Sequence, residues 1–281
     1  MVVSAEVRTA GANAPVGVDP SRASIARMYD YVLGGKDHYQ VDRDELERLR
    51  QVMPEVADLA FENRRYLIRV CRFLAERAGV EQYLDCGSGL PTTENVHQVV
   101  QRVEKLSKVV YVDNDPVVVA HGRALLEEND RTRFIAGDIF EPKSILEHDT
   151  VRQHLDWSRP IALMFVATLH HHQGDRHRPA EIMREYVEAL PSGSYVALSH
   201  LFDPGEGGDH DTMAAFQEAI AKGSLGGATA RTESEIRELL TGLELVEPGV
   251  VLLANWWPDG PSLTPLNPAQ RLIAGAVARK P

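Results

Sequence analysis

Cysteine is scarce in this sequence, and its scarcity excludes two kinds of protein. The 281 residues contain 2 cysteines, Cys71 and Cys86. Two cysteines cannot form a disulfide framework, and their spacing matches no zinc motif. Both are therefore expected to be free thiols in a reducing, cytoplasmic environment.

Basic residues and long apolar runs are also few. Lysine and arginine number 30 against 41 acidic residues, for a formal net charge of -11. This balance does not favour the phosphates of nucleic acid. The longest apolar run, 161–169, is too short to cross a bilayer, and the N-terminus shows no secretory signal pattern. The sequence predicts binding to neither nucleic acid nor membrane.

The order of the expected elements divides the chain into three parts. Residues 1–20 lack periodicity and predict a disordered tail, whereas 21–79 show helical spacing and no strand pattern, which predicts a helical cap or lid. From 80 to 281 strands alternate with helices, which predicts an α/β sheet covered on both faces, with ligands at the carboxyl ends of its strands. Strands are expected at 82–86, 109–112, 133–135, 161–166, 194–199, 243–254 (interrupted at Pro248-Gly249) and 272–278.

A glycine-rich turn follows the first expected strand, in the run Asp85-Cys86-Gly87-Ser88-Gly89. Glycine lets the backbone turn sharply and approach a ligand closely. The acid beside it suits a ligand with positive charge and hydroxyl or amino donors. The third glycine of the dinucleotide fingerprint is replaced by Thr92. By itself the turn is equally consistent with an ordinary strand-to-helix connection.

Two more carboxylates occupy the same position on the next two strands. The second strand ends in Asp113 and the third is followed by Asp138. An acid at the first of these positions can accept both ribose hydroxyls of an adenosine ligand. An acid at the next can accept a hydrogen bond from the exocyclic amine of adenine. Three successive strands with this feature indicate a binding edge more strongly than any one motif.

These motifs resemble those of class I S-adenosylmethionine-dependent methyltransferases. More narrowly, the chain is similar to the S-adenosyl methyltransferase family long known as a domain of unknown function (DUF574-like). Three segments carry the narrower resemblance, which extends from Ser21 to Pro281: Met28–Asp37, Leu84–Thr92 and Tyr111–Pro116. The resemblance implies a Rossmann-like sheet of seven mostly parallel strands, the last one antiparallel.

The resemblance also implies S-adenosyl-L-methionine as the cofactor and a set of residues that hold it. The amino-acid end would lie among the residues of the glycine-rich turn, the ribose at the second strand and the adenine at the third. The turn after the fourth strand would complete the site. In chain order the implied residues are Asp85, Gly87, Gly89, Asp113, Asn114, Asp138, Ile139 and Ala167.

Three adjacent histidines, His170 to His172, follow that fourth strand. Neighbours in sequence rarely point at one ion, so no metal site is predicted. Instead His170 or His171 is expected near the transferred methyl group. Because histidine titrates near neutrality, His170 is the candidate catalytic base. The alternative is a solvated or packed histidine, since methyl transfer often needs only positioning.

Polar aromatic residues in the predicted cap suggest a lid over the cofactor. Tyr29, Tyr31, Lys36 and His38 lie close together in sequence, and aromatic faces attract cations such as a sulfonium. Alternatively, the tyrosines only anchor the cap. Trp256 follows a late strand and is expected to line the acceptor pocket.

The predicted function is that of a cytoplasmic S-adenosylmethionine-dependent methyltransferase with a small-molecule acceptor. Asn63-Arg64-Arg65 either faces the cofactor carboxylate or contributes only surface charge. Two other functions remain open. A NAD(P)-dependent oxidoreductase is disfavoured by Thr92 and Asp85. A noncatalytic protein that senses the cofactor stays possible because no residue is an obligatory catalyst. The oligomeric state is not predicted.

Overall fold

The computed structural model describes residues 17–92, 94–126, 129–261 and 263–281. Its strands are β1 (Gln82–Cys86), β2 (Lys108–Asp113), β3 (Thr132–Ala136), β4 (Ala162–Val166), β5 (Tyr195–Leu201), β6 (Glu244–Leu245), β7 (Val251–Leu252) and β8 (Ile273–Arg279). Residues 1–16 of the predicted disordered tail lie outside the described residues. Val18, by contrast, is placed and packs against the core.

Helices precede the sheet and fill most of its connections. They are α1 (Ile25–Val32), α2 (Gln40–Arg50), α3 (Ala57–Arg72), α4 (Val96–Val103), α5 (Pro116–Leu125), α6 (Pro142–Leu146), α7 (Asp149–His154), α8 (Arg178–Ala189), α9 (Gly207–Lys222), α10 (Glu233–Glu238) and α11 (Pro268–Arg271), with short turns η1 (Phe73–Arg77), η2 (Leu169–His171) and η3 (Leu253–Asn255). None of the helices in the described ranges has the length and apolar character needed to cross a bilayer.

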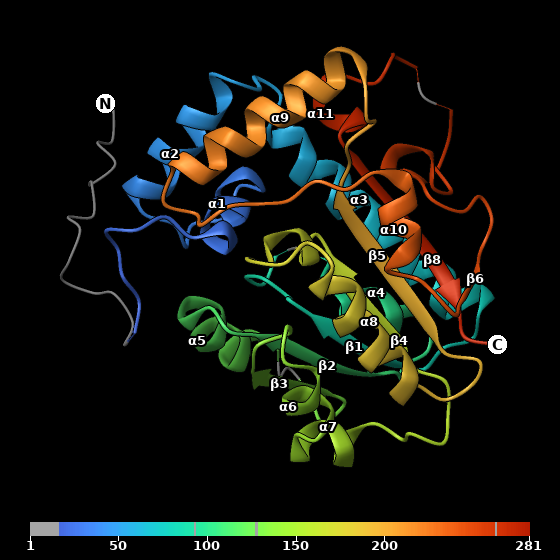
Figure 1. Cartoon of the computed structure of the whole chain (residues 1–281). Helices are drawn as coiled ribbons and strands as arrows, with labels where there is room; N and C mark the ends of the chain where they lie inside the picture. Colours follow the sequence, from blue (N-terminus) through green and yellow to red (C-terminus); the bar gives the residue numbers. More distant parts are fainter. Residues whose placement is uncertain (1–16, 93, 127–128, 262) are drawn as a thin grey trace.

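A single mixed sheet forms the centre of the molecule (Figure 1). The strand order is β3-β2-β1-β4-β5-β8, and β8 is antiparallel to β5 whereas the other neighbours are parallel. The short β6 and β7 both pair with β8, so the two occupy one edge position. The predicted sheet of seven positions with an antiparallel last strand is confirmed. Its edge is interrupted at Pro248-Gly249, as predicted.

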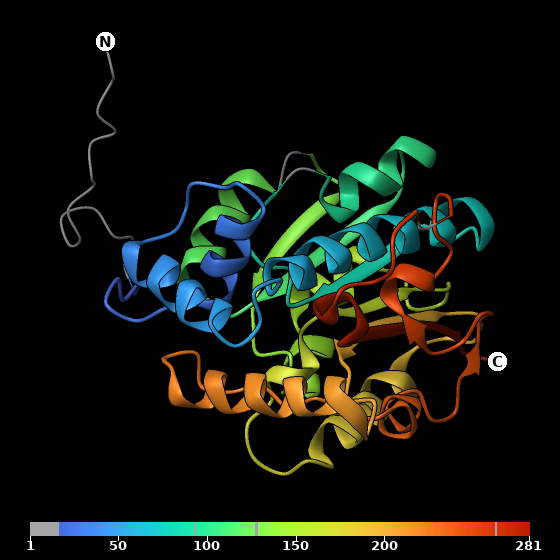
Figure 2. The same ribbon diagram turned by 90° about the horizontal axis from the view of Figure 1, so that it is seen from above.

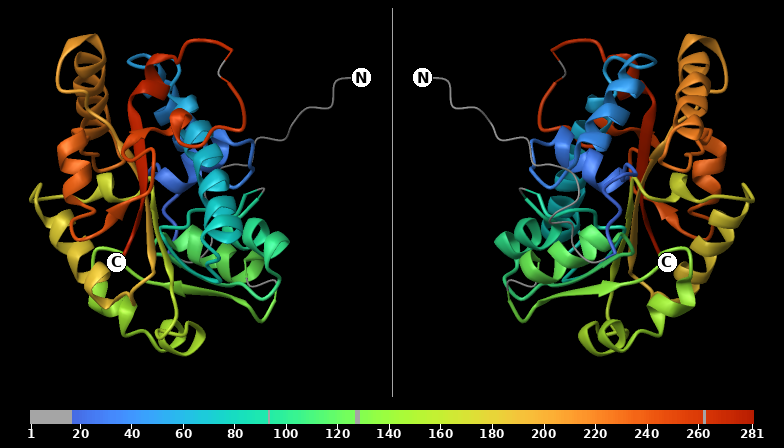
Figure 3. Two further views of the ribbon diagram at one scale, coloured as in Figure 1. Left: turned by 90° about the vertical axis from the view of Figure 1, so that its right-hand side faces the viewer. Right: turned by 90° about the vertical axis from the view of Figure 1, so that its left-hand side faces the viewer.

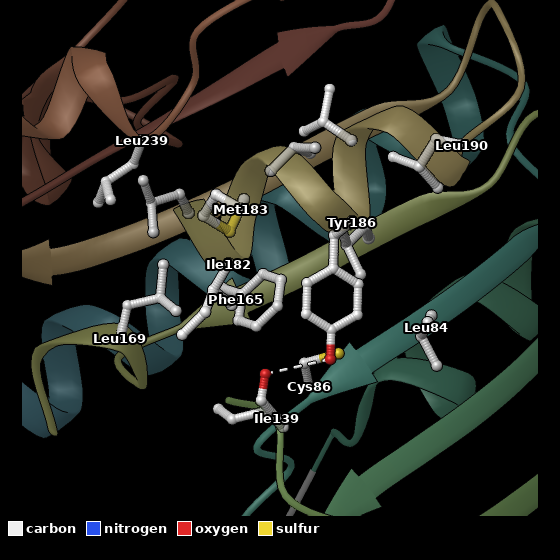
Figure 4. Close-up of a cluster of buried hydrophobic side chains, with 14 of the residues drawn as sticks. Leu84, Cys86, Ile139, Phe165, Leu169, Ile182, Met183, Tyr186, Leu190 and Leu239 are labelled. Atoms are coloured by element: carbon white, nitrogen blue, oxygen red, sulfur yellow. Dashed lines mark hydrogen bonds between the residues drawn. The ribbon is translucent and has the colours of Figure 1, made fainter. Parts of the chain in front are cut away.

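Helices cover both faces of this sheet, as Figure 3 shows edge-on. On one face α6, α7, α8 and α10 enclose a core with Leu84, Leu163 and Phe165 of the sheet. Within it Tyr186 of α8 packs on Phe165, and its hydroxyl donates to the Ile139 carbonyl oxygen at 3.1 Å (Figure 4). This contact holds the turn after β3 against α8.

The opposite face is covered by α3, α4 and α5. The hydroxyl of Tyr66 on α3 lies 2.9 Å from the carbonyl oxygens of both Leu198 on β5 and Ala276 on β8. The predicted division into a cap of 21–79 and a domain of 80–281 therefore needs correction, because α3 packs on the sheet. Helical spacing reveals an apolar face but not the partner that covers it.

The cap over the carboxyl ends of the strands consists of α1, α2 and α9 (Figure 2). Arg27 of α1 and Asp42 of α2 form a buried ion pair at 2.8 Å. The predicted cap of 21–79 does not include α9, because α9 lies far along the chain from α1 and α2. The shared cap core includes Met28, Leu46, Leu49, Met213, Phe216 and Ile220.

Gly275 of β8 tests how tightly the sheet is packed. A Cβ there would lie 2.6 Å from the Leu198 carbonyl oxygen and 2.7 Å from a methyl carbon of Leu253. We expect Gly275→Ala to lower the free energy of unfolding by about 1–3 kcal/mol, the usual cost of overpacking. Urea denaturation measures the change.

The matched control is Gly208→Ala in the first turn of α9, where a Cβ would meet nothing within 4 Å. This change removes the same freedom from the unfolded chain, so the free energy of unfolding should stay unchanged or rise slightly. Equal stabilities of the two variants would contradict the packing argument.

Candidate active site

A cavity of about 410 Å³ lies where the sheet meets the cap. We call it the cofactor cleft, after the ligand that the sequence motifs lead us to expect there. Its volume is within the range of small-molecule sites. Parallel register brings the ends of β1, β2 and β3 together, because Cys86 pairs with Val112 and Asp113 with Ala136. The cleft is lined by all eight residues expected to hold a cofactor: Asp85, Gly87, Gly89, Asp113, Asn114, Asp138, Ile139 and Ala167.

The glycine-rich turn after β1 requires glycine at two positions. Gly87 has φ +84°, and a Cβ there would lie 2.4 Å from Cγ2 of Thr168. Gly89 has φ +66° and faces open space, so a side chain would project into the cleft. The Gly87 N–H donates to the Val112 carbonyl oxygen at 2.8 Å, which attaches the turn to β2.

Asp113 connects the turns that follow β1 and β2. Its Oδ2 accepts from the Gly89 N–H and its Oδ1 from the Asp115 N–H, both at 2.9 Å. Burial raises the pKa of Asp113 to about 6, although these hydrogen bonds oppose the shift. The Asp115 carboxylate in turn accepts from the Ser24 hydroxyl at 2.6 Å. The cap is thus attached directly to the cleft.

Asp85 is buried at the base of the cleft. Burial raises the pKa of its carboxyl to about 7, while the Arg64 guanidinium opposes the shift and nearby Asp113 adds to it. Arg64 and Asn63 line the cleft from α3, whereas Arg65 is exposed beside Glu62. The Asn63-Arg64-Arg65 segment therefore faces both the cleft and the solvent. Helical rotation between neighbours is the reason.

A buried chain of hydrogen bonds fixes the turn after β4. Ala167 has a left-handed backbone, φ +59°, and its N–H donates to Ser199 Oγ at 2.8 Å. Ser199 Oγ donates to Asn63 Oδ1 at 2.6 Å, and Asn63 Nδ2 donates to the Tyr29 hydroxyl at 3.1 Å. Left-handed alanine costs roughly 1 kcal/mol or more, so the network must hold this turn. No sequence motif reveals it, because its members are far apart in the chain.

The structure places His170 away from the cofactor cleft, in the wall of a neighbouring apolar cavity. Its Nδ1 accepts from the Leu201 N–H at 3.4 Å, and its ring lies beside that of His200. Burial holds the pKa of His170 well below its usual value. His171, which lines both cavities, has a pKa lowered by burial to about 4. The expectation that His170 reaches the cleft is therefore wrong.

The described residues contain no cluster of three or more His, Cys, Asp or Glu side chains arranged to hold a metal ion.

Of the four residues expected in a lid, Tyr29 alone lines the cleft. The rings of Tyr31 and His38 pack on each other, 4.6 Å apart, and Lys36 is exposed. The turn after α1 directs these three residues away from the cleft. Within this turn the Asp37 N–H donates to the buried Asp30 carboxylate at 2.9 Å. That carboxylate occupies the space where Gly35 would carry a Cβ. The absence of a Cβ at Gly35 therefore allows this turn of the cap to form.

Trp256 also lies elsewhere than expected. It is fully buried, and its ring meets those of Tyr66 and Phe73 edge-on at 5.6 Å. Trp256 thus packs α3 and η1 against the sheet and does not line the cleft. Its position after a strand was misleading, because β7 is only two residues long and η3 turns the chain back into the core.

The strand order and the cleft together define a class I methyltransferase fold. The chain belongs to the S-adenosyl methyltransferase family, whose model matches residues 11–281. The cofactor of that family is S-adenosylmethionine. The resemblance found in the motifs is therefore confirmed.

Two solved structures are similar over nearly the whole chain. One is a candidate methyltransferase from Thermobifida fusca YX, 40% identical with a TM-score of 0.88, covering 94% of this chain and 97% of that one. The other is a DUF574 family protein from Streptomyces avermitilis MA-4680, 36% identical with a TM-score of 0.87, covering 94% and 99%. No curated protein matches the chain.

The raised pKa of Asp85 predicts a pH dependence of stability. The unfolded chain releases this proton near the ordinary value of 3.8, and the folded protein near pH 7. Between these values the folded state binds more protons, so this group's contribution to the free energy of unfolding falls as pH rises. The loss is about 4 kcal/mol at most.

Asp85→Asn removes the titrating group. The stability of the wild type relative to this variant should therefore fall between pH 4 and pH 8 in urea denaturation. Parallel curves for the two proteins would show that the folded state does not raise the pKa of Asp85.

Proposed function

We propose that this protein transfers the methyl group of S-adenosylmethionine to a small-molecule acceptor. One observation carries the proposal. Carboxylates from three successive strand ends, Asp85, Asp113 and Asp138, line a single cleft with the glycine-rich turn. The donors of the cofactor, its amine and hydroxyl groups, match this row of acceptors.

Each carboxylate would have a distinct partner. Every oxygen of Asp113 that accepts a backbone N–H has a second lone pair, which suits a ribose hydroxyl. Asp85 would face the protonated amine, which would favour the charged form of its carboxyl. Arg64, from the same part of the cleft, suits the carboxylate of the cofactor. Asp138 would accept from the adenine amine, with Ile139 against the ring.

The protein's contribution to the chemistry would be binding, orientation and exclusion of water. The bound cofactor supplies a methyl group activated by its sulfonium. Tyr29 from the cap and Ala167 from the turn after β4 line the cleft, and the hydrogen-bonded chain between them fixes both. Such fixed positioning can supply much of the acceleration of a methyl transfer. No obligatory base is required.

Two features support a small acceptor. Residues of α1, among them Ile25 and Tyr29, and Leu225 after α9 line the cleft. Because α1, α2 and α9 share one apolar core, the cap encloses this side of the cleft and favours a small acceptor. The formal net charge of -11 does not favour a nucleic-acid acceptor.

Asp113→Ala tests the ribose assignment. Removing hydrogen bonds to a charged group costs about 1.5–3 kcal/mol each, so we expect the affinity for S-adenosylhomocysteine to fall at least tenfold. Isothermal titration calorimetry measures it. Asp149→Ala, at the exposed start of α7, is the matched control and should bind as the wild type does. Equal affinities of the two variants would remove the assignment.

Methyl transfer itself is tested by incubating the purified protein with S-adenosylmethionine labelled in its methyl group and a panel of small acceptors. We expect label in one class of acceptor, in amounts that exceed the protein present. Tight binding of the cofactor without turnover on any acceptor would favour the sensing protein. Binding of NAD but not of S-adenosylhomocysteine would favour the oxidoreductase.

A further inference from the structure

A second cavity, of about 140 Å³, lies beneath the cap, and we call it the cap cavity. Its walls come from all three cap helices, with Met28 of α1, Leu49 of α2 and Phe216 of α9 among them. Its floor includes Leu201 of β5 and Ile273 of β8. The cap cavity is thus apolar on every side that the cap and the sheet provide.

The cap cavity adjoins the cofactor cleft through a shared boundary. Both are lined by Ile25, Tyr29, Asn63, Ala167, His171 and Leu225. Three of these residues, Tyr29, Asn63 and Ala167, belong to the hydrogen-bonded chain that fixes the turn after β4 and the cap. A molecule in the cap cavity therefore has its polar end at this boundary and its remaining surface against apolar walls.

The lining of the cap cavity carries no charge. Among the described residues that form it there is no Asp, Glu, Lys or Arg. Burial lowers the pKa of both histidines in the wall, His170 and His171, so both are neutral at pH 7. A charged molecule would lose its hydration here without gaining a counter-ion, which is costly. The cavity therefore selects uncharged molecules.

The volume of the cap cavity and the hydrogen-bonding groups at its boundary further narrow the class of molecule that it can bind. An apolar protein cavity of about 150 Å³ holds one benzene molecule. The cap cavity is close to that volume, so it suits a single six-membered ring. At the boundary the neutral imidazole of His171 offers a hydrogen-bond acceptor to a hydroxyl or amine.

We infer that the cap cavity is the acceptor site, and that the acceptor is an uncharged single-ring compound with a hydroxyl or amino group directed toward the cofactor cleft. This inference rests on the proposed function. In the transfer, a lone pair of the acceptor oxygen or nitrogen forms the new bond to the methyl carbon. The carbon–sulfur bond breaks and its electron pair stays on sulfur, which becomes a neutral thioether. The proton of the hydroxyl or amine leaves to water.

The first experiment uses the wild-type protein saturated with S-adenosylhomocysteine. Phenol and aniline are uncharged probes at pH 7.5, and benzoate and benzylamine are charged probes of similar size. We expect the uncharged pair to bind at least tenfold more tightly, as measured by ligand-observed NMR titration. Equal binding of the charged pair, or no binding of phenol, would overturn the inference.

A variant locates the binding. Ala60→Leu on α3 places a larger side chain in the cap cavity, since Ala60 lines that cavity and not the cofactor cleft. We expect at least tenfold weaker phenol binding and unchanged affinity for S-adenosylhomocysteine. Ala215→Leu, the same change on the exposed face of α9, should alter neither. Unchanged phenol binding in Ala60→Leu would place the probe elsewhere and refute the assignment.

The two proposals fail in different ways. If S-adenosylhomocysteine does not bind the wild type, the proposed function is wrong. If it binds, and phenol does not or is insensitive to Ala60→Leu, the methyltransferase proposal stands and the acceptor site lies outside the cap cavity. The comparison of charged and uncharged probes needs no variant, so a misfolded Ala60→Leu protein would not prevent the test.

Discussion

The carboxylate of Asp113 is the contact on which the cleft depends. It accepts one backbone N–H from the glycine-rich turn and one from the turn after β2. Through Asp115 and Ser24 the same region holds the start of α1. Two strand ends and the cap therefore meet around a single acidic group. Because desolvation of this half-buried group raises its pKa, its charge is costly without further donors. A ligand rich in donors is the natural counterpart.

Burial lowers the pKa of the histidines, whereas it raises the pKa of two carboxyl groups in the cleft. Asp85 and Asp113 hold protons more tightly than in water, whereas His170, His171 and His200 give theirs up more easily. In both cases desolvation disfavours the charged form. Hydrogen-bond donors of a ligand would therefore favour the charged form of the carboxyl groups in the cofactor cleft, whereas the histidines of the cap cavity stay neutral. The boundary between the two separates a polar ligand from an apolar one.

The cap connects these two environments. Its helices α1 and α2 precede the sheet in sequence and α9 follows β5, yet all three share one apolar core. That core forms the walls of the cap cavity, while Tyr29 on α1 also lines the cleft. The hydrogen bonds from Tyr29 through Asn63 and Ser199 fix the position of the cap relative to the turn after β4. Packing of the cap and geometry of the site are therefore coupled.

The sequence by itself determined the alternating fold and the row of acids, whereas the antiparallel last strand was implied by the resemblance to the methyltransferase family. These features are local: apolar periodicity specifies strands and helices, and parallel register carries each strand-end residue to one edge. Only the tertiary structure decided which helices form the cap, because amphipathic spacing shows that a helix has an apolar face but not which surface that face packs against. For the same reason Trp256 and His170 were misplaced. Both follow strands, but the turns after those strands lead them into buried packing, which depends on contacts with residues far along the chain.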